Sequence, residues 1–389
     1  MLFSSWPAYG HLLPMLPLIR AASAAGHEVR VASGADLVDL IAARGLVAQV
    51  AGPTLAQAYA AAAESVRRAG SATLTEVERS DPHQAALVAA RAFFGAAAVH
   101  RARDLLTAFD RWRPDLLVHD TVEIGGAAAA LVAGIPHVLH SYGPLVPAQG
   151  DFARAIGATV AAAGLPDPIE AVFAAPYLQV CPPSLAPDGA GPWTDVVPIR
   201  PSPGEIAGGE VRPAGFADLP HPTTVYVTLG TVTNQAPEVF RTVLDGCSRF
   251  PVNVLVTTGP GSDPAFLAAG RPAVLAVRFV SQALVLPHCV AVISHCGAGT
   301  MFGALAHGLP QLCLPQGTDQ PANAAAVARA GAALVLPPDR VDAGSVALAL
   351  DRVLHDPAIR SAAGRVRAEI DRMPAAEDVL PVIVGRAGP

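Results

Sequence analysis

Two series of short apolar segments, each segment followed by residues of helical character, constrain the fold of this chain more than any other feature. The first series comprises residues 1–5, 27–33, 114–120 and 137–141. The second series comprises residues 223–230, 252–258, 273–280, 290–295 and 309–315. Strands that alternate with helices form parallel sheets covered by helices. The chain is therefore predicted to be an α/β protein with two Rossmann-like halves.

Prolines separate the two series. They crowd between about residues 181 and 222, where the composition favours extended linker over packed helix. We therefore predict an N-terminal domain over 1–205, a linker over 206–222 and a C-terminal domain over 223–370. A length of 389 residues suits two domains. Within the first domain, the alanine-rich residues 55–100 are expected to form a helical insertion on the surface.

The basic residues exclude several classes of function. All 26 of them are arginines, and a chain without lysine lacks the ammonium group of a Walker P-loop, a protein-kinase ATP site or a pyridoxal-phosphate Schiff base. The formal net charge is −6, and the arginines are scattered rather than grouped into a basic stripe. We therefore expect no nucleic acid as partner.

Apolar residues are abundant, yet the chain does not look like a membrane protein. Hydrophobic residues make up 52% of it, but arginine, aspartate, proline or glycine interrupts every long apolar run before it reaches membrane-spanning length. The sequence begins in a strand-like segment without a basic leader, and its five cysteines form no Cys-x-x-Cys pair. These features predict a cytoplasmic protein without a membrane span.

A glycine-rich turn follows the apolar segment 290–295. Gly297 and Gly299 lie where a strand passes into a helix, and Thr300 is expected to open that helix. Glycines let the backbone approach a ligand closely, and the free N–H groups of a helix N-terminus attract phosphate. His295 can add a hydrogen bond or a positive charge. The turn therefore predicts a binding site for a diphosphate.

Asp319 offers a second interpretation of this turn. It follows Gly299 at roughly the spacing of a ribose-binding acid, as in the dinucleotide site of a dehydrogenase. The glycines argue against that site, because Gly303 completes G-x-G-x-x-x-G rather than G-x-G-x-x-G. Gln320 and Asn323 accompany Asp319. An acid beside an amide suits the hydroxyl groups of a sugar, whereas Asp319 taken alone is equally well explained as a helix cap.

Residues 295–324, HCGAGTMFGALAHGLPQLCLPQGTDQPANA, resemble the donor-binding signature of family 1 glycosyltransferases of the GT-B fold, especially the actinobacterial enzymes that glycosylate macrolides, enediynes and other polyketides. Residues 227–234 resemble the first strand of that family's second domain, 278–289 its nucleotide-base loop, and 8–33 its first βαβ unit. The resemblance covers most of the chain and implies two facing domains with a cleft between them. It also implies that the C-terminal segment 371–389 crosses back to the first domain.

The same resemblance implies which residues bind a nucleotide sugar, with TDP or UDP as the nucleotide. Ser281 stands where relatives commonly have proline, and Phe279 where many have tryptophan, so the identity of the base stays open. The implied donor-binding residues are Gly230, Thr231, Phe279, Val280, Ser281, Gln282, His295, Gly297, Ala298, Gly299, Thr300, Asp319 and Gln320.

His11 follows the first strand and matches the general base of the family. A hydroxyl group is a poor nucleophile, and an imidazole, which titrates near neutral pH, can remove its proton. Asp120 ends the segment 114–120, so a parallel sheet would bring it to the same edge as His11, where it could orient the imidazole. A capping or buried histidine and a helix-capping aspartate are the alternatives.

The acceptor is expected in the first domain. Trp6, Gly10 and Tyr142 are predicted to contact it, and a buried position at a strand end is the alternative for Trp6. His137 and His140 share one strand without further metal ligands, so we expect them to be structural or to line the cleft.

These features predict an inverting glycosyltransferase that moves a sugar, expected to be a deoxysugar, from TDP or UDP onto a hydroxyl of a lipophilic natural product. The chain contains no Asp-x-Asp sequence, so we expect neither a metal nor a resident cofactor. The alternatives are a nucleotide-sugar epimerase of the same fold and a non-catalytic binding or auxiliary protein. The motifs determine neither the acceptor nor the oligomeric state, and a homodimer stays open.

Overall fold

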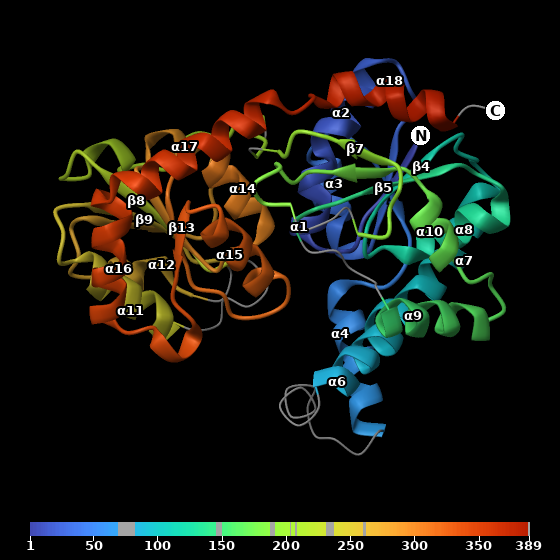
Figure 1. The fold of residues 1–389 in the computed structure, drawn as a ribbon, viewed down its shortest axis with the longest axis horizontal. Helices are drawn as coiled ribbons and strands as arrows, with labels where there is room; N and C mark the ends of the chain where they lie inside the picture. The colour runs from blue at the N-terminus through green and yellow to red at the C-terminus, as the bar shows by residue number, and fades with distance from the viewer. Residues whose placement is uncertain are drawn as a thin grey trace.

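Two halves, each built on one sheet, make up the molecule (Figure 1). The computed structural model describes residues 1–68, 82–144, 150–186, 191–202, 204–206, 208–230, 237–259 and 262–387. Every strand pair among these residues is parallel. The predicted α/β class with two Rossmann-like domains is confirmed.

The sheet of the first half has the strand order β3-β2-β1-β4-β5-β6-β7. Its strands are β1 (Leu2–Ser4), β2 (Arg30–Ser33), β3 (Val47–Val50), β4 (Leu117–Asp120), β5 (His137–His140), β6 (Tyr177–Gln179) and β7 (Val196–Pro198). The four predicted segments correspond to β1, β2, β4 and β5. The prediction lacks β3, β6 and β7. The last of these lies inside the proline-rich stretch, and as an edge strand it can accommodate Pro198 because one side of it makes no ladder hydrogen bonds.

Helices cover this sheet and extend away from it. They are α1 (Tyr9–Leu12), η1 (Leu13–Met15), α2 (Leu16–Ala24), η2 (Ala35–Leu37), α3 (Val38–Ala42), α4 (Leu55–Arg68), α6 (Pro82–Val88), the π-helical η3 (Ala89–Gly95), α7 (Ala96–Phe109), α8 (Ile124–Ala133), α9 (Gly150–Ala162) and α10 (Ile169–Ala174). The insertion expected over 55–100 is helical, and α4 and α6 project from the first half in Figure 1. Residues 127–130, four alanines, are fully buried, so α8 packs closely against the core.

The sheet of the second half has the order β10-β9-β8-β11-β12-β13. Its strands are β8 (Thr224–Thr228), β9 (Asn253–Thr257), β10 (Val274–Val277), β11 (Ala291–Ser294), β12 (Gln311–Cys313) and β13 (Ala333–Val335), of which only β13 is absent from the prediction. The helices after β7 are η4 (Phe216–Asp218), α11 (Pro237–Cys247), α12 (Pro264–Ala268), α13 (Gln282–Val285), η5 (Leu286–His288), α14 (Ala298–Ala306), α15 (Gln320–Arg329), η6 (Pro338–Arg340), α16 (Ala343–His355), α17 (Pro357–Arg372) and α18 (Ala376–Ala387).

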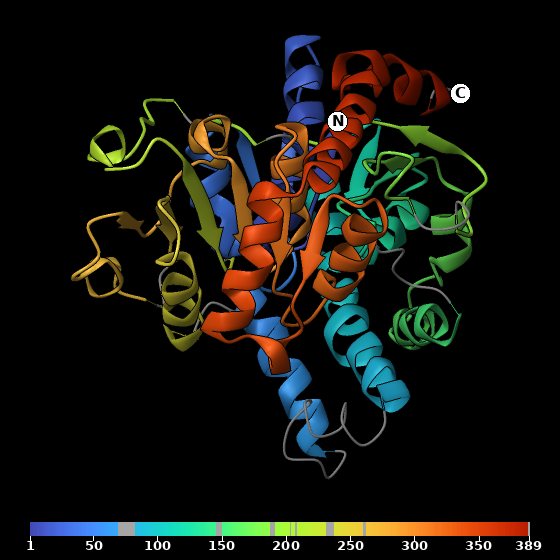
Figure 2. The ribbon, with the colours of Figure 1, turned by 60° about the vertical axis from the view of Figure 1, so that its left-hand side comes forward.

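The C-terminal helices join the two halves. Figures 1 and 2 show α17 along the second half and α18 beside α2 of the first half. Val379, Leu380 and Ile383 of α18 are buried in the same apolar cluster as residues of α2. The N–H of Arg200 donates to the carbonyl of Pro374 at 2.8 Å, where the chain crosses. The C-terminal segment therefore returns to the first half, as the family resemblance implies.

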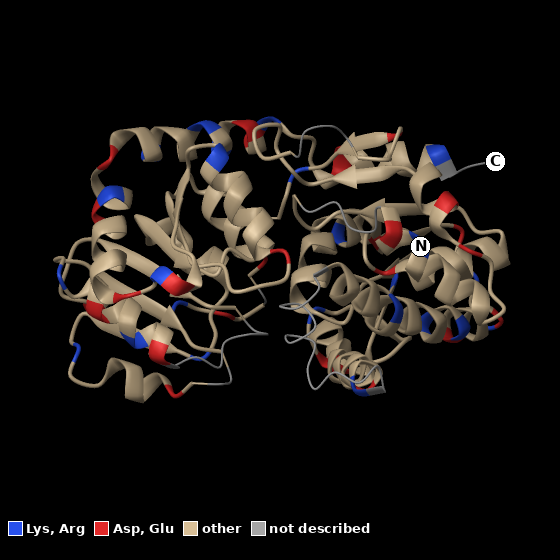
Figure 3. Ribbon diagram, turned by 60° about the horizontal axis from the view of Figure 1, so that its bottom comes forward, with Lys and Arg blue, Asp and Glu red and all other residues tan. Residues whose placement is uncertain are grey.

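Charge and hydropathy of the surface follow the composition. Figure 3 shows acidic and basic residues interspersed along the ribbon of both halves. Among the described residues, no helix combines the length and the apolar character needed to cross a bilayer.

Candidate active site

The topology places both candidate sites at equivalent points of the two sheets. In each sheet there is one point from which the chain adds its strands first to one side and then to the other. This switch point lies between β1 and β4 in the first half and between β8 and β11 in the second. Ligands of open α/β sheets bind at the carboxyl ends of the strands at such a switch point. His11 follows β1 and Asp120 ends β4, whereas Gly230 follows β8 and His295 follows β11. The predicted base and the predicted diphosphate site therefore occupy corresponding positions.

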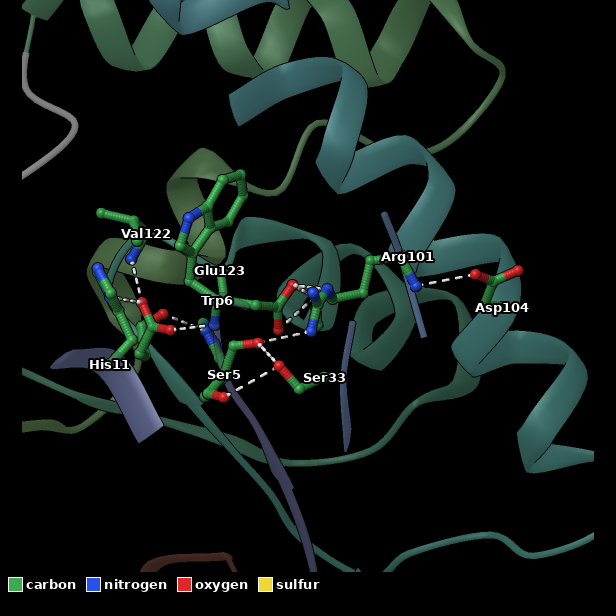
Figure 4. Close-up of polar contacts among 12 residues, drawn as sticks. Ser5, Trp6, His11, Ser33, Arg101, Asp104, Val122 and Glu123 are labelled. Atoms are coloured by element: carbon green, nitrogen blue, oxygen red, sulfur yellow. Dashed lines mark hydrogen bonds and ion pairs between the residues drawn. The ribbon is translucent and has the colours of Figure 1, made fainter. Parts of the chain in front are cut away.

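His11 and Asp120 face each other at the first switch point (Figure 4). Nδ1 of His11 lies 3.4 Å from Oδ1 of Asp120. The Asp120 carboxylate is buried and also accepts hydrogen bonds from the backbone N–H groups of Trp6 and Val122. The helix-cap alternative does not apply to Asp120, because Glu123 is the residue that caps α8, through the N–H of Gly126.

The surroundings keep the Asp120 carboxyl ionised. Burial by itself raises its pKa, but the charge and hydrogen bond of His11, together with the N–H groups of Trp6 and Val122, outweigh burial and place the pKa below the usual range. The His11 side chain remains 17% exposed. A proton held on Nδ1 by Asp120 leaves Nε2 as the free acceptor of the imidazole. This arrangement suits a general base.

The predicted acceptor residues lie in different environments. The Trp6 side chain is buried against Phe93 and Phe94, with ring centroids 5.0 and 5.3 Å away. Gly10 is exposed on α1. The ring of Tyr142 is buried 4.2 Å from that of His11. Trp6 therefore supports the position of the turn, and Tyr142 packs on His11.

The predicted diphosphate site is built around His295. The side chain lies between two glycines, because a Cβ placed on Gly230 or on Gly297 would come within 2.5 Å of Nε2. Gly230 also has φ +82°, a conformation that other residues adopt at a cost. Nδ1 of His295 is buried and finds no hydrogen-bond partner among the residues that the structure describes. An imidazole confined in this way with an unpaired nitrogen indicates a ligand site.

The helix after His295 presents its N-terminus to the same place. α14 begins at Ala298, two residues earlier than predicted, with Gly297 as N-cap. The first intrahelical bond runs from the N–H of Met301 to the carbonyl of Gly297, so the N–H groups of residues 298–300 precede it. The Thr300 hydroxyl accepts from Nε2 of Gln282 at 2.9 Å, which leaves its own proton available to donate.

His295 contributes to this site as a neutral group. Burial lowers the pKa of its imidazole, and the opposing effects of Asp319 and of the hydrogen bond with Thr228 are smaller. Of the two roles left open by the sequence, the hydrogen bond is therefore favoured over the positive charge.

Asp319 and Gln320 lie at the start of α15. Asp319 occupies the N-cap position, but its side chain caps no N–H in the described structure and instead accepts from Nδ2 of Asn323 at 2.8 Å. Nδ2 of Asn323 also donates to the carbonyl of Cys296, so α15 is tied to the turn that carries His295. Oε1 of Gln320 accepts from the N–H of Gln316. Asp319 is partly exposed, and its other carboxylate oxygen accepts from the Thr318 hydroxyl at 3.0 Å.

The predicted nucleotide-base loop combines exposed and anchored residues. Phe279 is 59% exposed, whereas Val280 is buried. The Ser281 hydroxyl donates to the carbonyl of Glu205, so the serine that replaces the family's common proline fixes the loop to the chain ahead of the linker. Thr231 lies outside the described residues.

The two halves meet between the two candidate sites. A Cβ placed on Gly143 would lie 3.1 Å from Cβ of Ala298, so the loop after β5 touches the first residue of α14. Tyr142 precedes this contact, and its pKa is raised well above the ordinary value by burial and by the charges of Asp319 and Asp120. Tyr142 therefore lies between the predicted base and the predicted donor site and stays protonated.

The remaining histidines of the first sheet are structural. Nε2 of His119 lies 3.1 Å from Nδ1 of His137, and Nδ1 of His140 contacts the carbonyl of Ser141. Burial lowers the pKa of His137 to about 3 and that of His140 to about 4. Among the described residues, no group of histidine, cysteine and acidic side chains is arranged to hold a metal ion.

Two buried charged residues near the base are missing from the sequence prediction. Arg101 of α7 and Glu123 ahead of α8 lie side by side, and Arg101 also contacts Ser5 (Figure 4). Nothing in the local sequence distinguishes Arg101 from Arg103, which lies two positions later in the same helix and is exposed. Glu123, before Gly125 and Gly126, has the local appearance of a helix cap only.

Comparisons with known proteins cover nearly the whole chain. The sequence models of erythromycin biosynthesis protein CIII-like proteins match residues 20–230 with their N-terminal domain and residues 241–385 with their C-terminal domain. L-demethylnoviosyl transferase of Streptomyces niveus is 31% identical over 387 residues, 96% of this chain and 94% of that protein. TDP-daunosamine transferase DnrS of Streptomyces peucetius is 29% identical, covering 96% of this chain and 93% of that protein.

A solved structure agrees with these matches. The crystal structure of the glycosyltransferase SnogD from Streptomyces nogalater is similar with a TM-score of 0.76 at 28% identity. The similarity covers 100% of this chain and 99% of that one, so it includes both halves and the returning C-terminal helices.

Proposed function

As a member of the erythromycin biosynthesis protein CIII-like family this chain is a glycosyltransferase, and we propose that it transfers a deoxysugar from TDP to a hydroxyl of a lipophilic natural product with inversion at the anomeric carbon. The predicted membership of the natural-product glycosyltransferases of GT-B fold is confirmed. The nucleotide, the sugar, the base and the stereochemistry are the parts that we propose.

One observation carries the proposal. The His11–Asp120 pair and the turn around His295 approach each other where Tyr142 packs on His11 and Gly143 touches Ala298. A base on one side and a diphosphate site on the other are the two groups that a direct displacement requires. The name of the Streptomyces peucetius relative specifies a TDP-sugar, which supports TDP as the nucleotide.

The proposed reaction is a single displacement. Nε2 of His11 takes the proton of the acceptor hydroxyl, and Asp120 stabilises the imidazolium that forms. The acceptor oxygen forms a bond to the anomeric carbon while the bond from that carbon to the diphosphate oxygen breaks, and the electron pair leaves with the diphosphate. Attack from the face opposite the leaving group inverts the configuration. Fixed positions of the two substrates supply much of the acceleration.

The leaving diphosphate gains negative charge, and we propose that uncharged hydrogen-bond donors stabilise this charge. The N–H groups at the start of α14, the proton of the Thr300 hydroxyl and the neutral His295 are the proposed donors. These donors take the role that a metal fills in other transferases. We therefore expect excess EDTA to leave the transfer rate unchanged, and a loss of activity that Mg²⁺ or Mn²⁺ restores would contradict this mechanism.

The direct test is a transfer assay with purified protein, TDP- and UDP-deoxysugars and a panel of macrolactone and aromatic polyketide aglycones. Mass spectrometry detects the glycoside, and NMR coupling constants give its anomeric configuration. We expect an inverted product and a preference for TDP. A donor that is epimerised without any acceptor would favour the epimerase, and binding of TDP without turnover on any aglycone would favour the auxiliary protein.

A further inference from the structure

A buried ion pair lies behind the proposed base. Nε of Arg101 is 3.5 Å from Oε1 of Glu123, and the two side chains are only 2% and 1% exposed. Nη1 of Arg101 donates to the carbonyl oxygen of Ser5 at 2.7 Å. Figure 4 shows that the guanidinium group lies between Glu123 and the end of β1. The pair therefore joins α7, the residues ahead of α8, and the strand that leads to His11.

The surrounding backbone is shaped to admit this arginine. A Cβ placed on Gly52 would come within 2.8 Å of Nε of Arg101, and one on Gly125 within 2.9 Å of its Cβ. The N–H of Gly52 donates to Oδ2 of Asp104, one helical turn after Arg101, so the same helix holds the loop that makes room. Gly52 thus makes room for the guanidinium group, and Gly125 makes room for the base of the same side chain.

Stability does not account for a pair in this place. Burial raises the pKa of Glu123 to about 7 in spite of the opposing attraction of Arg101. Nη2 of Arg101 is also buried without a hydrogen-bond partner in the described structure. Buried ion pairs are often no more stabilising than apolar residues of similar volume, because the loss of hydration offsets the attraction. A role in positioning other groups gives a better reason for the pair.

One peptide group connects the pair to the base. The carbonyl that accepts from Arg101 belongs to Ser5, and the N–H of the same peptide group is that of Trp6, which donates to Oδ2 of Asp120. A hydrogen bond to the oxygen of a peptide group polarises it and strengthens the bond that its N–H makes. Arg101, the peptide group between residues 5 and 6, Asp120 and His11 therefore form one continuous chain of contacts.

We infer that Arg101 is a positioning residue for the proposed general base: it acts through the Ser5–Trp6 peptide group to hold Asp120 and His11, while Glu123 fixes the guanidinium group. This inference rests on the proposed function, since it assigns Arg101 to the base of that reaction. Arg101 touches neither substrate, so its substitution changes the rate of transfer and not the binding of the donor.

The test replaces the pair by apolar residues of similar length, in the double variant Arg101→Met with Glu123→Met. We expect a folded protein with an unchanged Kd for TDP and a kcat lower by roughly 10–100-fold, as a misplaced reacting group causes. The matched control is the pair of Arg271 and Asp245 in the second half, which is partly exposed. Arg271→Met with Asp245→Met should leave kcat unchanged.

A second measurement separates positioning from a general structural effect. In a His11→Ala background the same double substitution should leave the residual rate unchanged, because Arg101 acts through His11. A further fall of the residual rate would overturn the inference, and so would a wild-type kcat in the original double variant.

If that variant does not fold, Glu123→Gln replaces it, because the amide still accepts from Gly126 while the ion pair is lost. The kcat of this variant and its Kd for TDP are then compared with the wild-type values: a lower kcat at an unchanged Kd supports the inference, and a wild-type kcat overturns it.

The wild-type protein separates this inference from the proposed function. If the wild type transfers no sugar to any aglycone, the proposed function fails. If the wild type transfers sugar and the variants transfer it equally fast, only the inference fails.

Discussion

The switch points of the two sheets share one topology but differ in their chemistry. The first holds buried charges, namely Asp120 with His11 and, behind them, Arg101 with Glu123. The second uses uncharged groups, namely a neutral histidine, glycines and the N–H groups of α14. A base must have its orientation and protonation fixed before the substrate arrives, whereas a phosphate site receives its charge with the ligand. Under the proposed function, one topology serves both needs through the residues at the carboxyl edge of each sheet.

The largest expected effect removes the base and leaves the donor site intact. His11→Ala should lower kcat by roughly 10²–10⁴-fold, the usual contribution of a general base, while calorimetric titration finds an unchanged Kd for TDP. His27→Ala, at an exposed histidine of the same half, is the control and should keep full activity. A His11→Ala variant with more than about a tenth of the wild-type kcat would remove the base from the mechanism.

The second prediction separates the diphosphate from the sugar. His295→Ala should weaken the binding of TDP by about 1.5–3 kcal/mol, because a hydrogen bond to a charged group is lost. Asp319→Ala should bind TDP normally and a TDP-sugar weakly, since the exposed carboxylate is proposed to contact only the sugar. Calorimetric titration of each variant with TDP and with a TDP-sugar measures the two affinities. Equal loss of TDP binding in the two variants would indicate that Asp319 contacts the nucleoside, as in a dinucleotide site.

The third prediction tests the space around His295. Gly230→Ala adds a Cβ within 2.5 Å of Nε2 at a positive φ, so it should displace the imidazole and weaken TDP binding roughly 10-fold or more. Gly26→Ala is a matched control, because Gly26 also has positive φ (+87°) but a Cβ there meets nothing within 4 Å. The control should lose about 1 kcal/mol of stability and no affinity. Equal affinities of the two variants would show that His295 does not depend on this glycine.

The smallest effect concerns stability rather than transfer. His137 and His140 stay neutral when folded, with pKa values of about 3 and 4, whereas in the unfolded chain they take up protons near pH 6.5. The unfolded state then binds more protons, so the free energy of unfolding should fall as the pH drops from about 7 to 4, by up to ~1.4 kcal/mol per unit for each group. Glu123, whose pKa is raised, offsets one of these groups over the same range.

Denaturant titrations at several pH values measure this slope. His137→Gln should make it shallower, and His355→Gln, at an exposed histidine, should leave it unchanged. Equal slopes for the wild type and His137→Gln would show that His137 does not hold its neutral form in the folded protein.

Local sequence patterns determined the architecture and the location of both sites. The carboxyl end of a strand can be recognised in the sequence where a polar residue precedes a glycine-rich or proline-containing turn. Parallel pairing brings all such strand ends to one edge of the sheet. The positions of His11, Asp120 and the turn at 297–300 at that edge were therefore accessible from the sequence, whereas the roles predicted for His11 and Asp120 came from the family resemblance. The strands β3, β6, β7 and β13 were not accessible, because β3, β7 and β13 are edge strands, β6 lies next to the edge strand β7, and β7 lies among prolines. These segments become strands only because they pair with a neighbouring strand of the sheet.

Only the tertiary structure decided which groups surround these residues. Gly230 and Gly297 enclose His295 because β8 and β11 are neighbours in the sheet, although they are distant in the chain. Tyr142 lies between the two sites because the halves meet there, and neither half specifies that contact alone. Arg101 is one of two arginines on an amphipathic helix, and its burial follows from how α7 packs against α8 and the end of β1. Hydrophobic periodicity predicts which face of a single helix or strand is apolar. Whether a charged side chain on that element is buried depends on the other elements that pack against it.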